Sequence, residues 1–368
     1  MSLPGRIPTE VAASLESPGL VIDIAAAKAN IDLLDARYAG SAVKVRPHFK
    51  AHKSLDLMRL QLESPSAIGA TCATVSEAMA LARDGVRDVL IANQVIEPAA
   101  LATLDRLSVM TDLRVAVDDV AHVELLAGAP SGTIGVLLEV DVGNHRCGID
   151  PNSPELEPLV ERIAMSPGLR FDGLMGYEGH AVLERDRTVR SELVVRAAAA
   201  LDLVRRRLDL AGFPCSVVSG GGTGTFDLAA DTGTYTEIQA GSYVLMDATY
   251  AGLDLPFGIA LYCFTRVLSA RSDRGVANAG LKVMSAEQGM PQMAMPAGSV
   301  TGLADEHARL VADGLRIGQG VWLVPSHVDP TVAMHDVVAA WDDETGLHTW
   351  HISRDDRHER ARLEHSTS

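Results

Sequence analysis

Short apolar segments alternate with segments of helical periodicity along the first part of the chain. The run at 134–142 is almost continuously apolar, as expected of a strand buried on both faces. Strands separated by helices indicate βαβ units, and about eight units before residue 250 favour a closed barrel over an open sheet. The expected strands are 20–23, 43–49, 68–73, 89–93, 113–117, 134–142, 171–177 and 215–219, and the expected helices are 25–38, 55–61, 74–84, 98–107, 119–127, 154–164 and 183–211.

The pattern changes after Gly252, where helical periodicity fades and short strand-like runs take over at 258–270, 280–284, 322–324 and 332–341. We therefore predict an α/β protein with a (β/α)8 TIM-type barrel over residues 20–252. A β-rich domain is expected from residues 1–19 together with 253–368, because chain termini often lie close together.

The composition narrows the class of protein. Hydrophobic residues make up 47% of the chain and aromatic residues only 4%, so Ala, Val and Leu must fill the core. The net charge of −16, without a basic stretch, argues against nucleic-acid and membrane partners. No signal-like start and no apolar run of about 20 residues is present. Four widely spaced cysteines without a CxxC pair favour a reducing compartment, so we expect a cytoplasmic protein.

A lysine follows the second expected strand, in the stretch 46–53 that reads Arg-Pro-His-Phe-Lys-Ala-His-Lys. In a barrel, the point where a strand ends and a loop begins is the catalytic rim. Positive neighbours such as Arg46 and Lys53, together with partial burial, lower a lysine pKa and make the amine a better nucleophile. We interpret Lys50 as the residue that carries an aldehyde cofactor covalently. The alternative is a solvated loop lysine.

A glycine-rich stretch follows the last expected barrel strand, and residues 219–225 read Ser-Gly-Gly-Gly-Thr-Gly-Thr. Backbone N–H groups of small residues at a strand end can form an anion-binding nest. The stretch matches neither the Walker pattern nor the dinucleotide fingerprint. It falls where barrels often bind phosphate, after strands seven and eight, so we predict a phosphate site. The alternative is a flexible loop.

Two other strand ends carry polar side chains. Arg146, in a segment rich in glycine, is a candidate for pairing with a cofactor oxygen, or for a structural ion pair with Asp141 or Glu139. Tyr177, in Gly-Tyr-Glu-Gly-His, is a candidate for contacting a cofactor ring, or is an ordinary tyrosine of the barrel rim.

A His-x-Asp pair, His327 and Asp329, lies in the expected second domain. On a strand these two side chains project from the same face. Imidazole with carboxylate suits a borderline cation such as Zn²⁺ or Mn²⁺, and other ligands must complete its coordination shell. A second acidic and histidine cluster at 305–307 is a candidate for joining this site or for capping a loop.

Taken together and in order, these motifs resemble the D-threonine aldolase and D-serine dehydratase family, which are pyridoxal-phosphate (PLP) enzymes with the alanine racemase-like fold. The resemblance runs from about residue 20 to residue 338 and includes Arg-Pro-His-x-Lys-x-His-Lys, Val-Asp-x-Gly-x-x-Arg-x-Gly, Gly-Tyr-Glu-Gly-His, Ser-Gly-Gly-Gly-Thr, Gly-Ser-Tyr-Val-Leu-Met-Asp and His-x-Asp-Pro-Thr. It implies an N-terminal barrel, a C-terminal β-domain and a homodimer.

The resemblance also implies residue roles. Lys50 matches the Schiff-base lysine, Arg146 the arginine beside the cofactor's phenolic oxygen, and Tyr177 the tyrosine on the pyridine side. The phosphate-binding segments are matched by Ser219, Gly221, Gly222, Thr223 and Tyr243. His327 and Asp329 match the divalent-metal pair, for which we expect Mn²⁺ first, with Mg²⁺ or Zn²⁺ as alternatives. Dehydratases of the family tend to carry His-x-Cys, so Asp329 favours an aldolase. The segment Ala-Glu-Gln-Gly at 286–289 is also more typical of the aldolases.

We therefore expect a lyase that cleaves a small D-β-hydroxy-α-amino acid to glycine and an aldehyde, as a D-threonine aldolase does. The proton acceptor for the hydroxyl is a metal-bound hydroxide or a nearby histidine such as His52. The alternatives are a dehydratase of D-serine or 3-hydroxy-D-aspartate, a 3-hydroxy-D-aspartate aldolase, a non-catalytic PLP carrier, and a racemase. Tyr262 is the candidate second acid–base group of a racemase.

Overall fold

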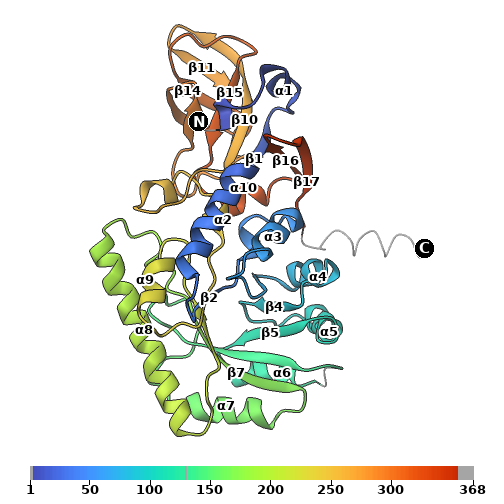
Figure 1. The fold of residues 1–368 in the computed structure, drawn as a ribbon, viewed down its shortest axis with the longest axis vertical. Coiled ribbons are helices and arrows are strands. Elements are labelled where there is room, and N and C mark those ends of the chain that lie inside the picture. The colour runs from blue at the N-terminus through green and yellow to red at the C-terminus, as the bar shows by residue number, and fades with distance from the viewer. Residues whose placement is uncertain (1–2, 129–130, 355–368) are drawn as a thin grey trace, which may run out of the picture. The chain divides into compact units, whose positions relative to one another are not determined.

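The structure is a computed structural model that describes residues 3–128 and 131–354, and the chain divides into two compact units. The barrel unit comprises Arg37–Lys50, Gln61–Gly241 and Ser353–Ser368. The sheet unit comprises Met1–Ala36, Ala51–Leu60 and Ser242–Ile352. Figure 1 traces the chain through both units.

The barrel unit contains eight parallel strands in the order β2-β9-β8-β7-β6-β5-β4-β3. Isolated parallel bridges, Val45 with Ala67 and His48 with Thr71, connect the two ends of this order and close the ring. The predicted eight-stranded barrel is thereby confirmed. Its strands are β2 (Lys44–Val45), β3 (Ala70–Cys72), β4 (Asp88–Ile91), β5 (Asp112–Val117), β6 (Ile134–Glu139), β7 (Leu169–Gly176), β8 (Val217–Gly220) and β9 (Glu237–Ile238).

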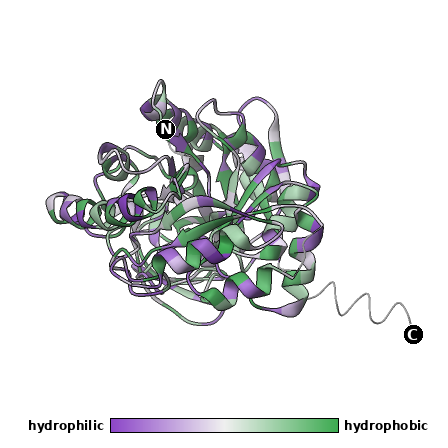
Figure 2. Ribbon diagram, turned by 90° about the horizontal axis from the view of Figure 1, so that it is seen from below, coloured by the Kyte–Doolittle hydropathy of each residue, from purple (hydrophilic) through white to green (hydrophobic). Residues whose placement is uncertain are grey.

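Helices follow the barrel strands and lie outside them, as Figure 1 shows for α4 to α8. Their apolar positions are the buried ones, as with Leu156, Leu159 and Ile163 of α7. The helical ribbons in Figure 2 carry both purple and green stretches. Thr74 is the N-cap of α4 as expected, since its hydroxyl accepts the Glu77 amide at 3.2 Å, and the Glu77 carboxylate accepts the amide of Ala73. The helices of the barrel unit are α4 (Val75–Arg83), α5 (Pro98–Leu107), α6 (Val120–Leu126), α7 (Leu156–Met165), α8 (Arg187–Leu210) and α9 (Phe226–Asp231), whereas α2 (Ile24–Tyr38) and α3 (Leu55–Leu62) lie mostly in the sheet unit.

The sheet unit is a nine-stranded, mostly antiparallel sheet, as predicted for the β-rich domain. The strand β10 is central, pairing with β1, β11 and β15. Aromatic side chains, including Tyr262, Phe264 and Trp322, fill one core cluster of this unit. The elements are α1 (Thr9–Ser14), β1 (Gly19–Asp23), β10 (Leu261–Arg271), β11 (Arg274–Ala277), β12 (Gln292–Met295), β13 (Ser299–Leu303), β14 (Ala308–Val311), β15 (Gly320–Val324), α10 (Val328–Val332), β16 (Val337–Asp342) and β17 (Gly346–His351).

One strand was assigned to the wrong sheet. The segment at 20–23 was expected to open the barrel, but β1 pairs antiparallel with β10, placing Val21 opposite Tyr262, and parallel with β16. An apolar strand buried on both faces has the same pattern in either sheet. The eighth barrel strand is instead β9, whose two residues, Glu237 and Ile238, show no apolar run. The strand expected at 280–284 is also wrong, since this segment forms turns.

None of the helices in the described part of the chain has the length and apolar character that crossing a membrane requires.

Candidate active site and metal pair

Four of the predicted cofactor segments begin where parallel strands of the barrel end. Lys50 follows β2, Arg146 follows β6, Tyr177 follows β7 and the glycine-rich loop follows β8. Because the carboxyl ends of parallel strands meet at one edge, the topology gathers these segments on the rim that carries the active site in barrel enzymes. The sequence interpretation placed all four on this rim.

Lys50 lies in a single 3-10 turn, Phe49–Ala51, and is half-buried. Backbone hydrogen bonds hold the segment before it on both sides: the His48 amide donates to the Ala240 carbonyl at 3.1 Å, and the Thr71 amide donates to Pro47 at 2.9 Å. The amine therefore projects from a backbone that neighbouring strands keep in place.

Arg46 does not act as the isolated positive neighbour that the sequence suggested. Its side chain is 2% exposed and makes a bidentate pair with Glu237, at 2.9 and 3.0 Å, and a second pair with Asp88. Two carboxylates therefore balance its charge inside the barrel.

Tyr177 is in contact with two other predicted cofactor residues. The guanidinium carbon of Arg146 lies 5.6 Å from the centre of its ring, a cation–π distance. On the loop after β8, a Cβ added to Gly222 would lie 3.3 Å from the Tyr177 ring and 3.0 Å from Val182. The structure thus brings Arg146, Tyr177 and Gly222 together, and a side chain larger than glycine at 222 would crowd the tyrosine ring.

The glycine-rich loop is buried, and its backbone follows a conformation that glycine permits, with φ of +74° at Gly221. The amide of Gly222 donates to the Thr225 hydroxyl at 3.0 Å. The Ser219 hydroxyl donates to Glu237 at 2.6 Å and accepts from Gln239 at 2.8 Å. Both contacts of the Ser219 hydroxyl are with other protein side chains, so its role in phosphate binding stays a prediction. Thr223 lies in the same buried loop.

Two predicted site residues, His52 and Tyr243, belong to the sheet unit. His52 is buried, and its Nδ1 accepts the Ser54 amide at 3.2 Å. An imidazole that accepts at Nδ1 carries its proton on Nε2 and is neutral, so this ring is a donor at Nε2. Tyr243 is 2% exposed and packs against Phe257 with ring centres 5.5 Å apart.

The predicted metal pair lies at the start of α10. The Nε2 of His327 is 3.9 Å from Oδ1 of Asp329, within the roughly 4.2 Å that two ligands of one ion at about 2.1 Å can span. On the other side of the ring, Nδ1 contacts the Glu287 carboxylate, and Asp329 accepts the Ser242 hydroxyl at 3.2 Å. An outer carboxylate on a histidine is typical of metal sites, so these residues fit a divalent cation.

Among the described residues, no three His, Cys, Asp or Glu side chains are arranged as a complete metal site. Two protein ligands are therefore supplied here, and water or substrate would complete the shell. The cluster at 305–307 does not supply a third ligand. Its Glu306 instead pairs with Lys282 at 2.6 Å.

Two buried carboxylates, Glu178 and Asp247, and the exposed carboxylate of Glu287 beside His327 have no role predicted from the sequence. Asp247 is fully buried, and burial raises its pKa to about 6 although backbone amides of Tyr250 and Val328 favour the charged form. Burial likewise raises the pKa of Glu178. The motifs contained these residues, but their partners lie far away along the chain.

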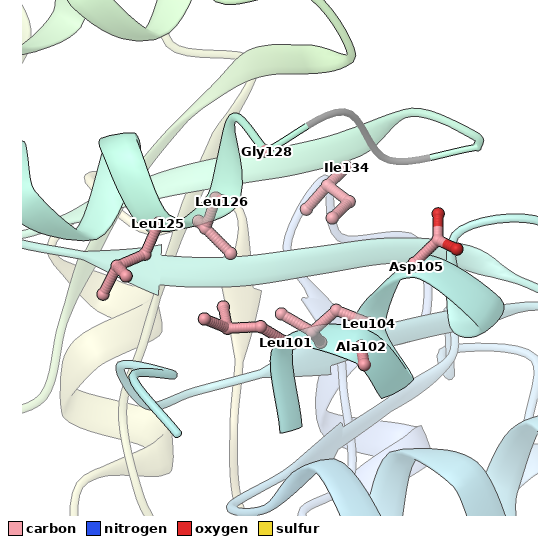
Figure 3. A pocket seen from close by; sticks show the side chains of 8 residues that line it. All are labelled: Leu101, Ala102, Leu104, Asp105, Leu125, Leu126, Gly128 and Ile134. Atoms are coloured by element: carbon pink, nitrogen blue, oxygen red, sulfur yellow. The ribbon is translucent and has the colours of Figure 1, made fainter. Parts of the chain in front are cut away.

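A separate cavity of about 290 Å³ is lined by side chains of α5, α6 and the start of β6. Figure 3 shows Leu101, Leu104, Leu126 and Ile134 pointing into it, with Asp105 at its side. None of the predicted site residues lines this cavity.

Comparison with known proteins agrees with the fold and with these motifs. Residues 22–249 match the family model "Alanine racemase, N-terminal domain", and residues 260–341 match "Putative serine dehydratase domain". The chain belongs to the D-threonine aldolase and D-serine dehydratase-like family, which has the alanine racemase-like fold.

Several relatives are similar over nearly their whole length. The chain is 35% identical to a D-threonine aldolase of an Arthrobacter species, covering 95% of each chain. It is 33% identical to a 3-hydroxy-D-aspartate aldolase of Paracoccus denitrificans, over 91% of this chain and 90% of that one. A D-threo-3-hydroxyaspartate dehydratase of a Delftia species is 27% identical, over 92% of this chain and 97% of that one.

A solved structure gives the same result. The crystal structure of D-threonine aldolase from Filomicrobium marinum superposes with a TM-score of 0.88 and 32% identity, covering 93% of this chain and 95% of that one. The named relatives are aldolases and dehydratases, and both are lyases.

Proposed function

We propose that this protein is a PLP- and divalent-metal-dependent aldolase that cleaves D-β-hydroxy-α-amino acids to glycine and an aldehyde, in the manner of a D-threonine aldolase. The observation that carries the proposal is the geometry of His327 and Asp329, a histidine and an aspartate whose donor atoms lie 3.9 Å apart with Glu287 on the far side of the ring. The similarity to D-threonine aldolases over nearly the whole chain supports it.

Residues of the barrel rim would hold the cofactor. Lys50 would supply the amine for covalent attachment, Arg146 would pair with a cofactor oxygen, and Tyr177 would contact the cofactor ring. The loop with Gly221, Gly222 and Thr223 would take the phosphate. When bound, PLP accepts the electron pair that is left on Cα as the Cα–Cβ bond breaks.

The metal pair would act on the substrate hydroxyl. A divalent ion, when bound, lowers the pKa of a hydroxyl or water that it coordinates. His327 would offer Nε2, because its Nδ1 is occupied by Glu287, and Asp329 would offer one carboxylate oxygen. The hydrogen bond from Ser242 orients that carboxylate. We propose Mn²⁺, with Mg²⁺ or Zn²⁺ as alternatives, because imidazole and carboxylate suit all three.

His52 is the less suitable of the two expected proton acceptors. Its Nδ1 accepts the Ser54 amide, so the neutral ring has no lone pair at Nε2. We propose instead that a divalent ion held by His327 and Asp329 would make the hydroxyl proton easier to remove, so His52 need not act as the base. His52 would then hold the backbone after Lys50 through Ser54.

A dehydratase is the second candidate, because the 27% identical Delftia relative is one. In that reaction the hydroxyl leaves after loss of the α-proton, and the same two sets of residues would serve. Asp329 favours the aldolase, since dehydratases of the family tend to carry cysteine at this position. A PLP carrier is not favoured, because a carrier needs neither the sheet unit nor its His-x-Asp pair.

We further propose a cytoplasmic homodimer that acts on a small-molecule D-β-hydroxy amino acid and on neither nucleic acid nor membranes. The dimer follows from the family resemblance alone, and the compartment from the cysteine pattern. Size-exclusion chromatography with light scattering would test the dimer.

Product analysis tests the function directly. The purified chain, with PLP and Mn²⁺, is incubated with D-threonine, 3-hydroxy-D-aspartate and D-serine. Glycine with an aldehyde, lost on adding chelator, is the expected result. Lys50→Ala should lose cofactor absorbance and turnover together, whereas Asp329→Ala should keep the absorbance and lose metal-dependent turnover. Ammonia with a 2-oxo acid would instead assign a dehydratase.

A further inference from the structure

Glu178 is a buried acid that the proposed reaction does not use. Its side chain is 0% exposed, and it follows Tyr177 directly in the chain. Neighbouring residues of an extended segment point to opposite faces. The Tyr177 ring accordingly contacts the glycine-rich loop at Gly222, while the Glu178 carboxylate contacts it at other points.

The carboxylate accepts hydrogen bonds from several parts of the loop and its surroundings. Oε2 accepts the Gly221 amide at 3.2 Å and the Tyr235 hydroxyl at 3.4 Å. Oε1 accepts the Thr225 hydroxyl at 2.6 Å. That hydroxyl in turn accepts the Gly222 amide at 3.0 Å. One side chain thus holds both ends of the turn 221–225 directly, at Gly221 and at Thr225, and it reaches Gly222 through the Thr225 hydroxyl.

Because of these contacts, two backbone amides of the loop are not available to an anion, contrary to the expectation from the sequence. The Gly221 and Gly222 amides were expected to donate to phosphate, yet both donate within the protein. Two backbone groups that could have bound an anion therefore instead fix the shape of the loop. A loop whose shape is set in advance binds its ligand with a smaller loss of conformational entropy.

We propose that Glu178 is the positioning residue that shapes the glycine-rich loop for the cofactor phosphate, acting through Gly221 and Thr225. The inference rests on the proposed PLP function. Glu178 does not touch the phosphate in this scheme. It fixes the turn through Gly221, Gly222 and Thr225 and leaves the other groups of the loop to face the phosphate. It also couples the loop to Tyr177, its neighbour in the chain.

The geometry accommodates either charge state of the acid. Burial raises the pKa of Glu178. If the acid takes up a proton on Oε1, the Thr225 hydroxyl can accept it and turn its own hydrogen toward the Gly222 carbonyl, while Tyr235 goes on donating to Oε2. A neutral acid would also spare a bound phosphate the repulsion of a nearby negative charge.

The test compares PLP with pyridoxal, which has the same ring and no phosphate, in binding to the full-length protein freed of cofactor. Cofactor absorbance gives both dissociation constants. Glu178→Ala and Thr225→Val should each reduce the preference for PLP over pyridoxal by about tenfold, with pyridoxal affinity little changed. Thr225→Val carries the test if the alanine variant does not fold.

The matched control is Glu77→Ala. Glu77 is another buried glutamate of the barrel unit, and it also accepts a loop amide, that of Ala73 at 2.8 Å, but far from the glycine-rich loop in the sequence. It should lose stability and keep the wild-type preference. If the Glu178→Ala and Thr225→Val proteins fold and keep the wild-type preference for PLP over pyridoxal, the role of Glu178 is overturned while the proposed phosphate site still stands. A wild-type protein without any preference for PLP would overturn the proposed phosphate site as well.

Discussion

The Oδ2 atom of Asp247 accepts the backbone amide of Val328 at 3.0 Å, and Val328 is the residue between His327 and Asp329. The other oxygen of this carboxylate accepts the amides of Thr249 and Tyr250 at 3.0 and 2.8 Å. Asp247 therefore ties the segment after the barrel to the backbone of the proposed metal pair.

We expect Asp247→Ala to weaken Mn²⁺ binding by about tenfold, because the backbone that carries both ligands loses its anchor. Titration followed by electron paramagnetic resonance measures the loss. The control is Asp342→Ala, which removes another carboxylate of the sheet unit that accepts two backbone amides, those of Glu344 and Thr345. Equal affinity in the two variants would show that Asp247 does not position the pair.

The contact between Glu287 and the imidazole ring of His327 gives a second prediction about the metal pair. Its carboxylate contacts Nδ1 of His327, which leaves Nε2 on the side of Asp329. Glu287→Ala should lower Mn²⁺ affinity by about tenfold, since an outer carboxylate fixes the tautomer and orientation of a ligand histidine. Glu287→Gln should recover part of the loss because its amide oxygen accepts the same N–H group. Glu306→Ala, at an exposed glutamate paired with Lys282, should bind Mn²⁺ as the wild type does.

The close approach of Gly222 to Tyr177 predicts a steric effect. An added methyl group would meet Val182 at 3.0 Å and the tyrosine ring at 3.3 Å, so one of them must move. Gly222→Ala should therefore weaken PLP binding several-fold, as measured by equilibrium dialysis. Gly233→Ala is the contrast, since its φ is +73° but nothing lies within 4 Å of the added atom. It should cost about 1 kcal/mol of stability and leave PLP affinity unchanged.

The barrel rim could be predicted because its polar residues come directly after apolar strands. Lys50, Arg146 and Tyr177 are visible in the sequence for this reason. The roles of the buried carboxylates could not be predicted, because their partners lie far away in the sequence. Glu178 accepts a backbone amide 43 residues away, and Asp247 accepts one 81 residues away. No local pattern records such a contact. The exchange of β1 for β9 has a similar cause, since strand pairing depends on segments distant in the sequence.

Ion pairs at the start of β5 predict a dependence of stability on pH. Asp112 pairs with Arg114 at 2.9 Å and with Arg170 at 3.1 Å. Burial alone would raise the pKa of Asp112, but hydrogen bonds and charge from the two arginines lower it below its ordinary value of 3.8. A carboxylate with a lowered pKa in the folded state stabilises the protein above its ordinary pKa, and this stabilisation is lost as pH falls through the folded value.

Asp112→Asn should therefore be less stable than the wild type at neutral pH, with the difference shrinking as the solution is acidified. Urea denaturation at several pH values measures it. Because the pair is partly exposed, added salt should also reduce the difference at neutral pH. A difference that stayed constant down to strongly acidic pH would contradict the assignment to this ion pair.

Tyr262 bears on the racemase alternative. It is 3% exposed in the core of the sheet unit, meets Trp322 edge-on with ring centres 6.2 Å apart, and donates its hydroxyl to the Ile259 carbonyl at 3.4 Å. Burial raises the pKa of Tyr262 to about 12. A buried phenol with a raised pKa and a backbone acceptor is a core residue rather than a proton donor to substrate, so Tyr262→Phe should keep the wild-type rate of glycine formation. Chiral chromatography of D-threonine incubated with either protein should show no inversion at Cα, and inversion that disappeared in the phenylalanine variant would restore the racemase role.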